Sequence, residues 1–116
     1  MTTESAVKAA PGAQVLDLIQ LRLQRALRER QRYRYVTPRV TVHDDGFRVQ
    51  SPCCSRNVDP QGGLIDIALL QPMVGGHWCL SSRDHAAGVW VPQLQDQPLE
   101  VLLDALCVDT ERVFWL

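Results

Sequence analysis

The chain has no apolar run that approaches the ~18 residues needed to span a bilayer. Its first residues, Met-Thr-Thr-Glu-Ser, lack the basic flank and the apolar core of a secretion signal. We therefore expect a soluble cytoplasmic protein with no membrane partner. In that compartment the four cysteines (Cys53, Cys54, Cys79 and Cys107) are most simply interpreted as reduced thiols.

Complete catalytic and redox signatures are also missing. The chain contains no Cys-x-x-Cys motif and no Gly-x-Ser-x-Gly elbow. Asp84 and His85 lie close in sequence to Ser81, Ser82 and Cys79, whereas a catalytic triad is assembled across a fold from distant residues. We therefore assign no enzyme activity and no cofactor.

The composition is that of an ordinary globular protein. Of the 116 residues, 46% are apolar and 22% are charged, which separates the chain from disordered sequences. A split at this length would leave fragments too small to bury a sufficient core. We expect a flexible N-terminus over residues 1–12 and one domain over residues 13–116.

The net charge of −1 conceals a strong segregation along the chain. Residues 1–42 carry eight basic and three acidic side chains, a net charge of +5. Residues 43–116 carry four basic and ten acidic side chains, a net charge of −6. A basic N-terminal segment thus precedes an acidic remainder.

An amphipathic helix is predicted from Ala13, ending around Gln31 to Arg34. Its apolar residues recur at spacings of three and four: Val15, Leu16, Ile19, Leu23, Ala26 and Leu27. The opposite, basic helix face carries Arg22, Arg25, Arg28 and Arg32. Such a face could bind nucleic acid phosphates or an acidic protein, or could be only a solvated surface. The pI near 6.3 disfavours nucleic acid.

Alternating segments after this helix predict an antiparallel sheet. Arg39 to Gln50 forms a hairpin around Asp44, Asp45 and Gly46, with an Asp-Gly turn. One buried face of this hairpin should consist of Val40, Val42, Phe47 and Val49. Three further strands are expected over Leu64–Gln71, His77–Ser82 and Gly88–Pro92.

A C-terminal helix is predicted to follow the sheet. Asp96 or Gln97 is placed to cap it before Pro98, and its apolar stripe consists of Leu99, Leu102, Leu103 and Leu106. The fold class is therefore α+β: an N-terminal amphipathic helix, a five-stranded antiparallel meander sheet with a long loop after strand 2, and a C-terminal helix. Helices packed on one face of the sheet would leave the other face exposed to solvent or available for assembly.

The long loop, Ser51 to Gly63, is the first candidate site. Its proposed ligand-binding or partner-binding residues are Cys53, Cys54, Ser55, Arg56, Asn57 and Asp59. In the alternative interpretation, Arg56 pairs with Asp59 or with Asp66 and only holds the loop. Asp66 itself lies between two isoleucines and is expected to face solvent.

Thiol and imidazole groups make zinc a weaker hypothesis. The candidate ligands are Cys53, Cys54, His77, Cys79 and His85, but adjacent cysteines diverge along an extended backbone and the spacing matches no known knuckle. We therefore predict no metal site.

These observations favour a protein that acts by binding, as a protein-interaction or regulatory module or as a homodimer. The second hypothesis is ligand or metal binding through the Cys53–Cys54 loop. The third is association with nucleic acid through the basic helix face.

Overall fold

The computed structural model describes residues 13–30, 37–52 and 63–115, with side chains from Asp17 onward. Its elements are α2 (Ala13–Arg28), β1 (Arg39–His43), β2 (Gly46–Pro52), β3 (Leu64–Pro72), the 3-10 turn η1 (Val74–Gly76), β4 (Trp78–Asp84), β5 (Val89–Gln97) and α3 (Leu99–Val108). Each strand pairs antiparallel with the next, in the order β1-β2-β3-β4-β5. This confirms the predicted α+β class. The predicted flexible N-terminus lies outside the described residues.

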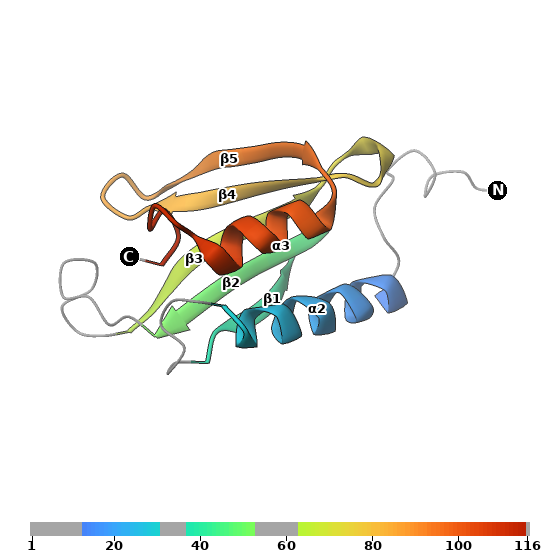
Figure 1. Cartoon of the computed structure of the whole chain (residues 1–116), viewed down its shortest axis with the longest axis horizontal. Coiled ribbons are helices and arrows are strands. Elements are labelled where there is room, and N and C mark those ends of the chain that lie inside the picture. The colour runs from blue at the N-terminus through green and yellow to red at the C-terminus, as the bar shows by residue number, and fades with distance from the viewer. Residues whose placement is uncertain (1–12, 31–36, 53–62, 116) are drawn as a thin grey trace.

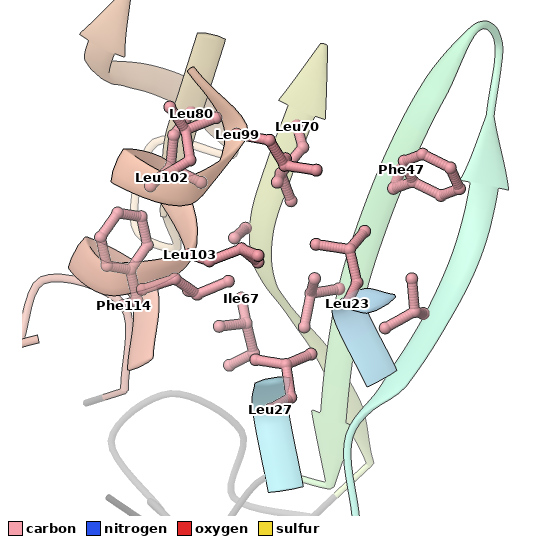
Figure 2. Packing of buried hydrophobic residues seen from close by; sticks show 14 of the residues in the cluster. Leu23, Leu27, Phe47, Ile67, Leu70, Leu80, Leu99, Leu102, Leu103 and Phe114 are labelled. Carbon is pink, nitrogen blue, oxygen red and sulfur yellow. The ribbon is translucent and has the colours of Figure 1, made fainter. Parts of the chain in front are cut away.

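Both helices cover the same face of the sheet (Figure 1). Leucines from α2 and α3 point toward the strands, where they meet residues such as Phe47 and Leu70 (Figure 2). Phe47 also stacks on Trp78, with ring centroids 6.1 Å apart. The described residues of the predicted amphipathic stripes therefore form the core between the two layers, whereas the side chains of Val15 and Leu16 lie outside the described part. No described helix is long and apolar enough to cross a membrane.

The β1–β2 hairpin differs from the prediction at its turn. Gly46 pairs with His43 inside the ladder, so the two-residue connection is Asp44–Asp45, and Asp44 has a φ of 54°. Gly46 is required for another reason: a Cβ atom there would lie 2.1 Å from the carbonyl oxygen of Leu70 in β3. Val42 pairs with the buried Phe47 but is itself 49% exposed near the end of the edge strand β1, so the expectation that it is buried is wrong.

Several predicted boundaries also need correction. α2 ends at Arg28, before the expected Gln31–Arg34 boundary, and β5 continues beyond Pro92 to Gln97. Asp96 therefore belongs to the strand, and the residue preceding α3 is Pro98, which makes no side-chain capping bond. β5 is exposed along most of its length and needs only one neighbouring strand, so its polar sequence resembles a loop.

The two edge strands of the sheet, β1 and β5, limit their rows of unpaired backbone groups in different ways. At β1, the Gln20 amide of α2 donates a hydrogen bond of 2.7 Å to the carbonyl oxygen of Val40. At β5, the strand carries Pro92, and its pairing with β4 shows register shifts. Asp96 near its end has a φ of 57°. Neither edge is a long, regular row of unpaired backbone groups.

The segment after α3 is fastened by one carboxylate. Asp109, 5% exposed, accepts backbone N–H bonds from Val113, Phe114 and Trp115 at 2.8, 3.1 and 2.8 Å. The Trp115 indole donates to the carbonyl oxygen of Leu106 at 2.8 Å, and the buried Arg30 guanidinium lies 4.7 Å from the ring centroid. This segment therefore packs as part of the core.

Candidate functional site

Polar side chains gather on the sheet face that the helices leave uncovered. Phe47 and Val49 of β2 are buried under the helices, so Arg48, between them, points to the opposite face. A register shift follows Val49, and Gln50 then pairs with Asp66 of β3. The strands thereby bring to one surface residues that are well separated in sequence.

Asp66 is the centre of this surface. Its Oδ1 lies 3.7 Å from Arg48 Nε, and its Oδ2 lies 3.8 Å from Arg83 Nε. Gln50 donates its side-chain N–H to Oδ1 at 3.1 Å. We call Arg48, Gln50, Asp66 and Arg83 the Asp66 cluster. The expectation that Asp66 lies on the face away from the core is met, but the carboxylate is only 21% exposed because its neighbours cover it.

The arginines of the Asp66 cluster are incompletely used, in the sense that most of their N–H donors make no hydrogen bond with the described residues. Both contacts with Asp66 involve Nε and exceed hydrogen-bonding distance, so they are electrostatic contacts and not bidentate forks. Within the described part of the chain, neither terminal guanidinium group donates a hydrogen bond, and the buried Nε of Arg48 has no hydrogen-bond partner. Two partly exposed guanidinium groups therefore flank a single carboxylate.

Two ring side chains border the cluster at its β4–β5 side. The Arg83 guanidinium lies 5.0 Å from the centroid of the Trp90 ring, which orients it by a cation–π contact. Burial lowers the pKa of His85 below its ordinary value, Arg83 lowers it further, and Asp66 and Asp84 oppose the shift. This lowered pKa favours the neutral imidazole, so the arginines are the main cations of the cluster.

The neighbouring strand extends this surface. Arg39 of β1 pairs with Gln50, which pairs with Asp66, so the three residues form a row across the sheet. Arg39 is exposed. Among the described residues of this row and the cluster, three arginines accompany one carboxylate. Arg39 comes from the basic part of the sequence, and Arg48 and Arg83 come from the acidic part.

The predicted loop residues Cys53, Cys54, Ser55, Arg56, Asn57 and Asp59 lie outside the described residues. The strands that bracket them are placed, however. β2 ends at Pro52 and β3 begins at Leu64, so the loop joins the sheet beside the Gln50–Asp66 pair. The described partners of Asp66 are Arg48, Gln50 and Arg83.

The basic helix face lies on the other side of the molecule. Arg22, Arg25 and Arg28 are exposed on α2, while Arg32 lies outside the described residues. Arg22 Nη2 contacts Glu100 Oε2 at 3.0 Å, and this hydrogen bond lowers the pKa of Glu100. The predicted basic face therefore adjoins acidic side chains of α3, with a groove of about 410 Å³ between the helices.

The described zinc candidates are not assembled into a site. His77 Nδ1 lies 3.0 Å from Asp96 Oδ1, and Cys79 Sγ lies 4.0 Å from Ser81 Oγ. His85 stands at the far end of β4, beside Arg83. No group of three or more potential ligands (histidine, cysteine, aspartate or glutamate) occurs among residues 17–30, 37–52 and 63–115.

Sequence reasoning missed Arg48, Gln50, Arg83 and Trp90 as parts of one surface. The local signal was present, because Arg48 interrupts Phe47 and Val49 in a half-buried strand. Asp66 likewise interrupts an apolar run. Joining them requires the register between strands, including the shift at Val49 and Gln50, which alternation within a single strand does not reveal.

Comparison with known proteins adds a family assignment. Residues 12–116 match one protein family, described as "Domain of unknown function (DUF3024)". No curated protein and no solved structure matches the chain.

Proposed function

Since the chain belongs to the DUF3024 family, whose description carries no activity, we propose from its own residues that it is a protein-interaction module. The bound partner is a protein with an acidic segment, and the binding surface is the uncovered sheet face around the Asp66 cluster. The observation that carries this proposal is the pair of incompletely used guanidinium groups on either side of Asp66.

The chemistry of these groups favours a carboxylate-bearing partner. An arginine presents its terminal N–H donors as a planar fork that matches a carboxylate in a bidentate geometry. Asp66 contacts only the Nε side of each arginine, which leaves the terminal donors for a second anion. The Trp90 ring limits the rotamers of Arg83 and so reduces the entropy lost when that anion binds.

A peptide suits this surface better than a nucleic acid does. The chain has a net charge of −1 and a pI near 6.3, so a polyanion extending beyond the cluster would meet acidic surroundings. Sheets that bind single strands offer several exposed rings for base stacking. On the uncovered face of the described strands, Trp90 is the aromatic residue, and Arg83 already lies over it. A short acidic segment needs only local complementarity.

The proposal can be tested by NMR with a hexaglutamate peptide as the probe. Backbone and arginine Nε–H signals of ¹⁵N-labelled protein should shift at Arg48, Gln50 and Arg83, and a hexaglutamine peptide should cause no shift. Loss of one charge-assisted bond at a half-exposed site should weaken binding about tenfold in Arg48→Gln and in Arg83→Gln.

Arg28→Gln is the matched control, because it removes an exposed arginine from α2 and should change the affinity less than about twofold. Shifts centred on Arg22, Arg25 and Arg28 would move the site to the basic helix face. Tighter binding of an oligothymidylate than of hexaglutamate would favour nucleic acid. Wild-type affinity in both cluster variants would refute the proposal, provided that circular dichroism shows them folded.

A further inference from the structure

The outer surface of the helical layer carries two parallel bands of opposite charge. α2 and α3 run side by side in the same direction (Figure 1), because their contacts advance together along both helices. Arg22 contacts Glu100, and further along Cys107 donates to the carbonyl oxygen of Ala26 at 3.4 Å. Residues of the two helices can therefore be compared by their level, that is, by their position along the common direction of the helices.

The band on α2 begins with exposed leucines and carries three exposed arginines (Arg22, Arg25 and Arg28) against two exposed carboxylates, Asp17 and Glu29, so its net charge is positive. Leu18, Leu21, Arg25 and Arg28 follow one another at spacings of three and four, so they share one helical face. All four are exposed, and Leu18 and Leu21 are 66% and 49% exposed. The buried residues Leu23 and Leu27 lie on the opposite face. This stripe is thus the outermost line of the helix.

The band on α3 is acidic and also contains an exposed aliphatic side chain. Glu100, Val101 and Asp104 are exposed, whereas Leu102 and Leu106 are buried against the sheet. The Arg22–Glu100 contact sets the level of the two helices. Together with the contact between Cys107 and Ala26, it gives offsets of 78 to 81 positions between the helices. The pairs Leu21–Val101 and Arg25–Asp104 fall within this range and therefore lie at about the same height along the helices, and Arg25 and Asp104 both line the groove between them.

We infer that this surface is the interface of a homodimer whose two-fold axis runs parallel to the helices, between α2 and α3. Rotation about that axis places each α2 over the partner's α3 without changing the level. Leu21 then packs on the partner's Val101, and Arg25 meets the partner's Asp104. Each contact occurs twice, which is the property of a self-complementary two-fold interface.

The charges on the helices favour a two-fold axis parallel to them over one perpendicular to them. A two-fold axis in the same plane but perpendicular to the helices would lay α2 on α2. The arginine bands would then face each other, and like charges in an interface are unfavourable. The axis parallel to the helices instead pairs each basic band with an acidic band and encloses the exposed aliphatic side chains. The occupant that fits both bands is a second copy of this chain.

The size of the layer indicates a weak dimer. The 16 residues of α2 extend about 24 Å, and two helices side by side are about 20 Å wide, a footprint of roughly 500 Å² per copy. Stable interfaces bury about 600–1,000 Å² per copy, so this one falls below that range, among weak interfaces. We expect dissociation in the range of about 10–100 μM. The uncovered sheet face stays free, so the dimer is independent of the acidic-segment proposal.

Sedimentation equilibrium on the full chain tests the inference with a charge exchange. Arg25→Glu and Asp104→Arg should each weaken association at least tenfold, because each places like charges across the interface twice. The double variant Arg25→Glu/Asp104→Arg should return to within about threefold of wild type, since the exchanged charges meet again. Arg112→Glu, an exposed residue outside the bands, should leave association unchanged.

Leu21→Asp supplies a second test that does not depend on the ion pair. Leu21 is half exposed in the single chain, so this variant should keep its circular dichroism spectrum and sediment as a monomer. A wild-type monomer at ~500 μM, well above the expected dissociation range, would overturn the inference. A double variant as weakly associated as the single variants would also overturn it, since it would show that Arg25 does not meet the partner's Asp104.

Discussion

Replacement of Asp109 by alanine should destabilise the protein more than any surface change. The carboxylate accepts three backbone N–H bonds from residues 113–115 and is itself buried. A hydrogen bond to a charged group contributes about 1.5–3 kcal/mol, and a buried donor left without an acceptor costs about 1–3 kcal/mol. Three such bonds lost together would be comparable with the whole stability of a small domain, about 5–15 kcal/mol.

Release of the segment limits this loss. Without its acceptor, residues 113–115 can detach and satisfy their N–H groups with water. What is then lost is the docking of Phe114 and Trp115, where burial of a large apolar side chain contributes about 1.5–3 kcal/mol. We therefore expect Asp109→Ala to lower the free energy of unfolding by about 3–5 kcal/mol.

Urea unfolding followed by circular dichroism and by tryptophan fluorescence measures this change. Asp109→Asn keeps one acceptor oxygen and tolerates the φ of 45°, so it should cost only about 1–2 kcal/mol. Glu111→Ala, an exposed neighbour, should change the free energy by less than ~0.5 kcal/mol. A loss below ~1 kcal/mol in Asp109→Ala would refute the reasoning, because three native bonds would then contribute almost nothing.

Three further outcomes are expected. Gly46→Ala should cost about 2–4 kcal/mol in urea unfolding, because its Cβ would collide with the Leu70 carbonyl, whereas Gly75→Ala, in open space with a φ of 87°, should cost only about 1 kcal/mol; equal losses would contradict the close approach. Because the pKa of His85 is lowered from 6.5, the unfolded state binds more protons, so stability should fall as the pH drops below about 6.5, and His85→Asn should remove that part of the slope. Burial raises the pKa of Cys107 above 9.0, so the native state keeps this proton longer; stability should decline above about pH 9, less steeply in Cys107→Ser, which can still donate to Ala26.

Periodicity predicted the elements whose side chains point into the core. Leu23 and Leu27 recur at helical spacing, and Phe47 and Val49 alternate, because each pattern follows from burial of one face. The meander was also predictable, since successive strands joined by short turns usually pair. The long connection between β2 and β3 is the exception to this rule.

Features set by contacts between distant residues were not predictable. Gly46 seemed to serve the turn, but its function in the fold depends on how closely β3 approaches. The Asp66 cluster depends on a register shift, and the three N–H groups that meet Asp109 come from a segment with no repeating pattern. Local propensity contains no information about these distances.

The treatment of the sheet edges determines how this protein can grow into larger assemblies. Because Gln20 occupies the carbonyl oxygen of Val40 at β1, and because Pro92 and the irregular pairing interrupt β5, the described edges offer a foreign strand no continuous template. Addition of strand after strand, the route by which sheets polymerise into fibrils, is therefore obstructed at both ends. The broad faces are then the surfaces left for the association that we propose, and there side-chain identity can discriminate one partner from another.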